Sequence, residues 1–163
     1  MKILYICTHN RCRSILSEAI TNSVAAGLIE ARSAGSQPAG EVHPLTLKYL
    51  NQAGYATEGL TSQSWHDFTD FKPDIVITVC DSAAGESCPL YFGSSLKVHW
   101  GLNDPSKIQA DEDQIEQAFL ACINEISQRV EKLKLLAKQA LAPAELKLAL
   151  EKIAADQLKE TVN

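Results

Sequence analysis

The sequence has no long apolar run, no cluster of basic residues and no cysteine–histidine set with zinc-ligand spacing. Its apolar runs fall well short of the roughly 20 residues that a membrane-spanning helix needs. The net charge of −5 and the lack of a Lys/Arg cluster argue against nucleic-acid binding. The short apolar run at the N-terminus does not have the form of a secretory signal peptide. We therefore expect a cytoplasmic protein without a metal site and without a membrane or nucleic-acid partner.

The composition is instead typical of one globular domain with a sizeable core. The chain has 163 residues, of which 45% are hydrophobic and 21% are charged. In a chain of this intracellular type we interpret the cysteines as thiols and not as a disulfide framework. The cysteines are Cys7, Cys12, Cys80, Cys88 and Cys122. Composition alone predicts an enzyme or a binding domain and nothing narrower.

Short apolar runs alternate with segments of helical periodicity along the chain. Strands are predicted at residues 2–6, 28–34, 74–79 and 97–100, and helices at residues 13–26, 43–54, 64–68 and 111–139. This alternation predicts a three-layer α/β sandwich with a four-stranded parallel sheet, formed by residues 1–139. Residues 140–163 are predicted to form an extra C-terminal helix that begins at Pro143 and packs on the domain or on a partner.

A cysteine and an arginine stand at the two ends of the loop between the first strand and the first helix. Cys7 directly follows the strand, and Arg13 lies six residues later, where the helix begins. Backbone N–H groups and the helix dipole make such a loop an anion site, and arginine can bind a tetrahedral oxyanion through two parallel hydrogen bonds. The same field predicts a lowered pKa and a thiolate at Cys7, which Ser14 can stabilise by donating a hydrogen bond.

The residues inside this loop are predicted to surround the oxyanion. The predicted oxyanion-binding set is Thr8, His9, Asn10, Arg11, Cys12 and Arg13. Within it, Asn10 is expected to hold the shape of the loop, and His9 and Arg11 add donors or positive charge. Cys12 is assigned to packing. The alternative interpretation is that Cys7 is a small buried core residue. A core cysteine, however, does not require the arginine and serine that follow it.

Three chemically active side chains follow three different predicted strands. Cys7 follows the first strand, Cys80 the third and Asp104 the fourth. Ligands of parallel α/β sheets bind at the carboxyl ends of the strands, so we expect these side chains to share one site. For Asp104 the alternative is a turn residue that precedes Pro105.

A second pair of cysteines separates the hypotheses about function. Cys80 and Cys88 flank a segment rich in alanine, glycine and serine that could bring them together. Phosphatase chemistry needs one cysteine, one arginine and one acid, whereas reductive chemistry must pass oxidised sulfur outward by thiol–disulfide exchange. The alternative is that Cys80 is a core residue at the end of its strand and that Cys88 is a loop thiol.

Together these motifs resemble the arsenate reductases that are built on the low-molecular-weight protein tyrosine phosphatase fold. The resemblance covers residues 1–139 and leaves the tail from residue 140 outside it. The motifs that carry it are Cys7-x5-Arg13-Ser14, Val79-Cys80…Cys88-Pro89 and His99-Trp100-Gly101…Asp104-Pro105.

The resemblance implies a mechanism for arsenic detoxification. The Cys7 thiolate would attack arsenate held by the loop amides and Arg13, and Asp104 would act as general acid. Cys80 would then attack the adduct and release arsenite, and Cys88 would move the disulfide to a Cys80–Cys88 pair. The expected partners are arsenate, with phosphate or sulfate as competing oxyanions, and thioredoxin or glutaredoxin as the external reductant.

Two departures from the family pattern bear on cofactors and substrates. Some of these reductases bind a monovalent cation through positions matched here by Asn10, Glu18 and Ser33, together with an aspartate that is Gln63 in this chain. Because that carboxylate is missing, we expect no cofactor.

Tyrosine phosphatases of this fold usually carry an aromatic residue after the Asp-Pro pair. This chain has Ser106 and Lys107 there, which argues against a phosphotyrosine substrate. Two alternatives to the reductase stay open. One is a small tyrosine phosphatase whose extra cysteines protect Cys7 from oxidation. The other is a non-catalytic binding module that responds to oxyanions or to redox state.

Overall fold

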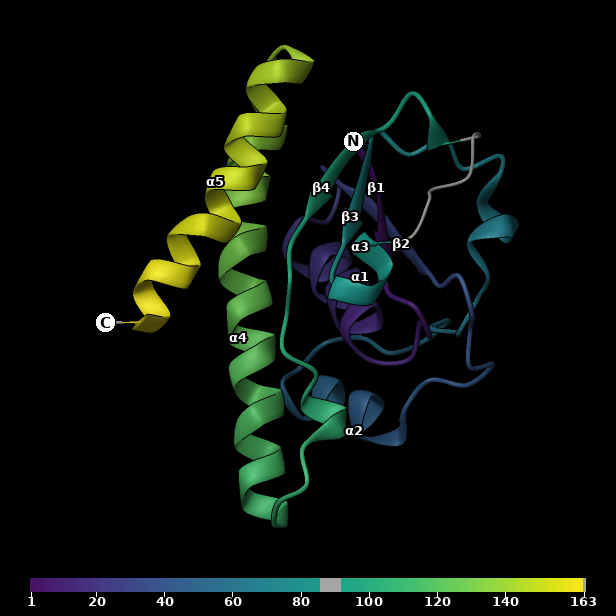
Figure 1. Cartoon of the computed structure of the whole chain (residues 1–163), viewed down its shortest axis with the longest axis vertical. Coiled ribbons are helices and arrows are strands. Elements are labelled where there is room, and N and C mark those ends of the chain that lie inside the picture. The colour runs from purple at the N-terminus through teal and green to yellow at the C-terminus, as the bar shows by residue number, and fades with distance from the viewer. Residues whose placement is uncertain (86–91, 163) are drawn as a thin grey trace.

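The computed structural model describes residues 1–85 and 92–162, in which four parallel strands form one sheet (Figure 1). The strands are β1 (Lys2–Ile6), β2 (Glu30–Ala34), β3 (Ile75–Thr78) and β4 (Leu96–His99). Their order in the sheet is β2-β1-β3-β4, and Leu4 of β1 pairs with Arg32 on one side and Val76 on the other. The predicted parallel α/β fold is confirmed, and the carboxyl ends of all four strands lie at one edge.

Among the described residues, the helices follow the predicted order, with two short elements that the sequence did not predict. The helical elements are α1 (Arg13–Val24), α2 (Pro44–Gln52), η1 (Trp65–Phe68), α3 (Asp81–Ala84), η3 (Pro105–Lys107), α4 (Glu112–Ala137) and α5 (Pro143–Val162). Residues 81–84, expected as part of a loop, form the single helical turn α3. The sulfur of Cys80 caps this turn by accepting a hydrogen bond from the backbone N–H of Ala83.

The core lies between the sheet and its covering helices. All four residues of β3 are buried, as are the last four of β1, which is expected of strands that are covered on both faces. Helix α1 packs on β1 and β2 and contacts α4. Cys122 lies on the buried apolar stripe of α4, as expected of a core residue.

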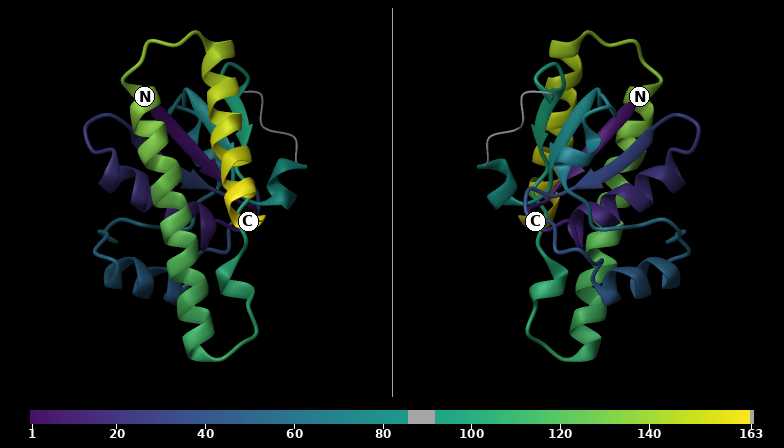
Figure 2. Two further views of the ribbon diagram at one scale, coloured as in Figure 1. Left: turned by 90° about the vertical axis from the view of Figure 1, so that its left-hand side faces the viewer. Right: turned by 90° about the vertical axis from the view of Figure 1, so that its right-hand side faces the viewer.

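The C-terminal helix α5 packs on the domain, alongside α4 and against β4 (Figure 2). Leu150 and Ile153 are buried in this contact, and the indole N–H of Trp100 donates to the Leu150 carbonyl at 2.9 Å. Within residues 1–85 and 92–162, no helix combines the length and the apolar character needed to cross a membrane.

Candidate active site

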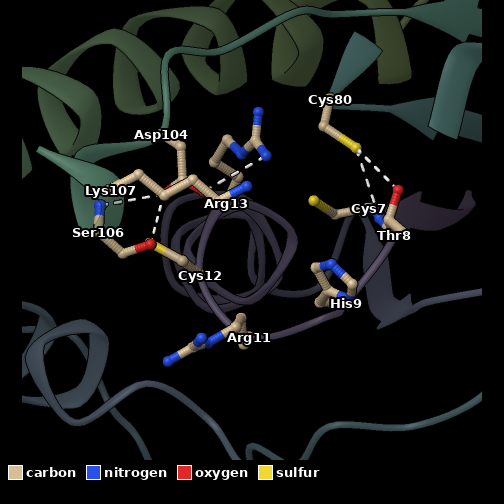
Figure 3. A pocket seen from close by; sticks show the side chains of 10 residues that line it. All are labelled: Cys7, Thr8, His9, Arg11, Cys12, Arg13, Cys80, Asp104, Ser106 and Lys107. Carbon is tan, nitrogen blue, oxygen red and sulfur yellow. Dashed lines mark hydrogen bonds and ion pairs between the residues drawn. The ribbon is translucent and has the colours of Figure 1, made fainter. Parts of the chain in front are cut away.

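A pocket of about 100 Å³ lies at the carboxyl edge of the sheet, above the loop that joins β1 to α1 (Figure 3). Residues from three separate segments line it: Cys7, Thr8, His9, Arg11, Cys12, Arg13, Cys80, Asp104, Ser106 and Lys107. The structure thus brings Cys7, Arg13, Cys80 and Asp104 together in one site. Cys88 falls outside the described residues, so its place in the relay stays a prediction.

Asn10 anchors the loop from its buried side. It has a positive φ of 47°, a conformation that asparagine tolerates better than most residues, and its side chain is fully buried. Its Nδ2 donates to the Ser14 hydroxyl at 2.8 Å, and its Oδ1 accepts from the backbone N–H of Gln63 at 2.8 Å. These two bonds fix the loop to α1 and to the segment that precedes η1.

Gly35, which sequence reasoning missed, lets the end of β2 approach the loop closely. A Cβ atom at this position would lie 2.5 Å from the Thr8 carbonyl oxygen and 2.9 Å from that of Cys7. No side chain fits there without displacing the loop backbone. The sequence offered one signal for this role, because Gly35 directly follows a predicted strand at the edge of the sheet where the site was expected.

Arg13 is oriented by the segment that follows β4. Its Nη1 donates to the Leu102 carbonyl at 3.0 Å, and its Nη2 lies 3.4 Å from Oδ2 of Asp104. Its Nε is buried and has no hydrogen-bond partner among the described residues. A buried N–H without a partner is costly, so this atom is suited to donate to a bound anion.

Asp104 is held at the other side of the pocket by its neighbour Ser106. Its Oδ1 accepts hydrogen bonds from the Ser106 backbone N–H at 3.0 Å and from the Ser106 hydroxyl at 2.6 Å. The second carboxylate oxygen faces Arg13. The carboxyl group therefore has a defined position at the rim of the oxyanion pocket.

Cys7 and Cys80 are coupled in the pocket, because a hydrogen bond between their sulfurs shifts the pKa values of the two thiols in opposite directions. A hydrogen bond from the Cys7 thiol lowers the pKa of Cys80 to about 5, and the backbone N–H groups of Ala83 and Thr8, each 3.4 Å from the sulfur, lower it further. The same bond to Cys80, together with burial, raises the pKa of Cys7 even though Arg13 acts to lower it. This direction is opposite to the lowered pKa that the sequence predicts for Cys7, and because the two thiols titrate as one pair, the predicted Cys7 thiolate stays a prediction.

The structure also places three other residues of the predicted site, Cys12, His9 and Ser14. Burial raises the pKa of Cys12 to about 11, which fits the packing role assigned to it. His9 is exposed, and its Nδ1 lies 3.1 Å from the Gln37 carbonyl oxygen. Ser14 is fully buried beside Asn10, and its hydrogen bond to the Cys7 sulfur stays a prediction.

The side chains that could hold a monovalent cation already have partners. Oδ1 of Asn10 binds Gln63, and Oε2 of Glu18 accepts from the Ser33 hydroxyl at 3.0 Å. Burial raises the pKa of Glu18 to about 7, while the nearby Arg32 guanidinium acts to lower it. The Arg32 guanidinium also pairs with Glu30 at 3.3 Å, and the expectation of no bound cation stays a prediction. The described residues contain no group of three or more His, Cys, Asp or Glu side chains that could hold a metal ion.

A pocket with this arrangement belongs to enzymes that bind a tetrahedral oxyanion beside a cysteine nucleophile. Comparison with known families identifies which: residues 2–155 match the low molecular weight phosphotyrosine protein phosphatase family, and the chain belongs to it. The match extends into α5.

Several relatives within this family are arsenate reductases. The chain is 32% identical over 132 residues to an arsenate reductase of Shouchella clausii, which covers 80% of this chain and 94% of the relative. A structure described as an arsenate reductase in the phosphate binding state matches with a TM-score of 0.69 and 27% identity, over 83% of this chain and 98% of that one. The thioredoxin-dependent arsenate reductase of Corynebacterium glutamicum matches with a TM-score of 0.65 and 29% identity, over 84% of this chain and 61% of that one.

Proposed function

We propose that this protein reduces arsenate to arsenite, with electrons supplied through its own thiols. The observation that carries the proposal is the contact between the two sulfurs: Cys80 accepts hydrogen bonds from the Cys7 thiol and from the loop N–H of Thr8. A phosphatase needs no second thiol at this point, whereas a reductase needs one within reach of the nucleophile. The named relatives support the same activity.

The first step joins arsenate to Cys7. The loop amides and Arg13 hold the oxyanion, the Cys7 sulfur bonds to arsenic, and one hydroxide leaves. The Asp104 carboxylate takes up the proton lost by Cys7 and donates it to the departing hydroxide, so that one water leaves.

The second step reduces arsenic. The Cys80 thiolate attacks the Cys7 sulfur, a disulfide forms, and the electron pair of the broken sulfur–arsenic bond stays on arsenic, which leaves as arsenite. Cys88 then attacks Cys80, which frees Cys7 and leaves a Cys80–Cys88 disulfide. An external dithiol reduces this disulfide. Thioredoxin is a suitable donor, since one related structure is thioredoxin-dependent, and glutaredoxin is the alternative. Phosphate and sulfate would compete at the oxyanion pocket, and the cytoplasm is where such reductants operate.

Arsenite release by the purified protein, with a thioredoxin or a glutaredoxin system, tests the proposal. Cys7→Ser should abolish all turnover, Cys80→Ser should stop the reaction at the adduct, and Cys88→Ser should allow a single turnover only. Cys122→Ser, on the buried stripe of α4, is the matched control and should remain active. If the wild type hydrolyses phosphate esters but releases no arsenite, and Cys80→Ser and Cys88→Ser hydrolyse the esters equally well, the protein is a phosphatase. If the wild type binds phosphate but neither hydrolyses esters nor releases arsenite, it is a binding module.

A further inference from the structure

Two cations in the pocket take no part in the proposed reaction. Arg11 and Lys107 both line it, both are exposed, and neither forms an ion pair with a carboxylate of the described residues. Among the described residues that line the pocket, the one carboxylate, that of Asp104, already faces Arg13. The described lining therefore carries excess positive charge, although the whole chain has a net charge of −5.

Lys107 is placed to reach a bound anion. It is the last residue of η3, three positions after Asp104, and its side chain extends across the pocket mouth (Figure 3). An ammonium group on a flexible stem is a common ligand of phosphate-like oxygens. Ser106 fixes the start of η3 through its two hydrogen bonds to Asp104, so the backbone from which Lys107 extends has a defined position.

The pocket suits an inorganic anion better than an organic ester. Its volume of about 100 Å³ leaves little room beyond a tetrahedral oxyanion, and no Phe, Tyr or Trp is among the described residues that line it. The aryl or peptide group of an ester would extend out of the pocket past the hydrated ammonium group of Lys107, and it would find no aromatic ring to stack on among the described residues of the lining. A free oxyanion with close to two negative charges would instead gain a charge-assisted hydrogen bond.

We propose that Lys107, assisted by the field of Arg11, forms an outer cationic subsite that binds the outward-facing oxygens of arsenate and selects the free dianion over phosphate esters. The proposal rests on the arsenate reductase function and specifies its substrate selectivity. Lys107 moves no proton in this scheme. It compensates negative charge on the oxygens that Arg13 and the loop amides do not reach.

Steady-state arsenite release and calorimetric binding of inorganic phosphate test the subsite. Lys107→Met should raise the KM for arsenate and the Kd for phosphate about tenfold, with little change in kcat, and Lys107→Arg should restore both. Arg11→Ser should have a smaller effect that added salt removes. Lys107→Phe should improve kcat/KM for p-nitrophenyl phosphate while it weakens arsenate binding. Lys152→Met, which removes an exposed charge on α5, controls for the change in net charge.

The two proposals fail in different ways. If Lys107→Met binds phosphate and turns over arsenate as Lys152→Met does, the subsite is wrong and the reductase can still be right. If the wild type never releases arsenite, the reductase is wrong, and the phosphate Kd of the same variants still decides whether Lys107 binds the anion. A fall in kcat with an unchanged KM would also overturn the subsite, since it would place Lys107 in the chemical step.

Discussion

The two segments that bring sulfur into the pocket are held in different ways. The loop after β1 is fixed by buried groups: both polar atoms of the Asn10 amide are bonded, and Gly35 packs directly on the loop backbone. The element α3 after β3 is a single helical turn, and the Cys80 sulfur caps it by accepting a backbone hydrogen bond. A second contact is the pair between the Asp81 carboxylate and His99 at 3.0 Å, in which the Asp81 side chain is 96% exposed.

This difference matches the two halves of the proposed reaction. Binding an oxyanion and attacking it requires donors that do not move, because displaced donors lose most of their effect on the transition state. A disulfide relay requires the reverse, since Cys80 must first reach the Cys7 sulfur and then turn to another thiol. The hydrogen bonds that hold the Cys80 sulfur are also the ones that its oxidation would remove.

The largest effect is expected where the fixed loop touches β2. Gly35→Ala would place a Cβ 2.5 Å from the Thr8 carbonyl oxygen, so either the loop or the strand end must move. We expect a loss of about 3 kcal/mol in unfolding free energy by urea titration and the loss of measurable phosphate binding. Ser36→Ala is the control, because it changes the next residue and removes a buried hydroxyl with no partner among the described residues. Normal phosphate binding by Gly35→Ala would show that the loop is adaptable.

The buried carboxyl group of Glu18 on α1, the helix that follows the fixed loop, predicts that the free energy of unfolding depends on pH. Burial raises the pKa of Glu18 from 4.5 to about 7, so the folded state holds this proton more tightly than the unfolded state. The contribution of protonated Glu18 to the free energy of unfolding is fully present below about pH 4.5. It is lost as the pH rises to about 7, and the loss is on the order of 2–3 kcal/mol. Glu18→Gln should therefore be more stable than the wild type above about pH 7 and equal to it below about pH 4.5, in urea titrations.

Glu131→Gln, on the exposed side of α4, is the matched control and should follow the wild type at every pH. The same titrations in potassium chloride and in tetramethylammonium chloride test the expectation of no bound cation. Stabilisation by potassium that is confined to the higher pH range, and absent in Glu18→Gln, would contradict it.

Removing the second sulfur should return the thiolate to the fixed loop. In Cys80→Ser the hydrogen bond that raises the pKa of Cys7 has lost its thiolate acceptor, and the lowering effect of Arg13 remains. We expect Cys7 to be alkylated by iodoacetamide at least tenfold faster near pH 7 than in the wild type, with the site assigned by mass spectrometry. In the wild type the thiolate should appear above about pH 5 and should belong to Cys80. Faster alkylation of Cys7 in the wild type than in Cys80→Ser would reverse the assignment.

One property of parallel sheets explains why the sequence could predict both the fold and the shared site of Cys7, Cys80 and Asp104. In a parallel sheet, residues that directly follow strands must share one edge, and this places Cys7, Cys80 and Asp104 together without any contact being known. The coupling between the Cys7 and Cys80 thiols could not be predicted in this way, because it depends on a hydrogen bond between residues 73 positions apart. The turn α3 is too short for a periodic pattern, and the importance of Gly35 depends on how closely β2 approaches the loop.

The smallest effect is expected at the exposed tie of α3. Asp81→Asn removes the charge that faces His99 and keeps a side chain that can still form a hydrogen bond. An exposed pair contributes little, so the unfolding free energy should change by less than about 0.5 kcal/mol. Because the tie also restrains the turn that Cys80 caps, the rate of the disulfide-forming step in a single turnover should be unchanged or somewhat faster. A loss of more than about 1 kcal/mol, or a slower step, would mean that α3 is held as firmly as the oxyanion loop, and the contrast between a fixed and an adaptable half of the site would no longer hold.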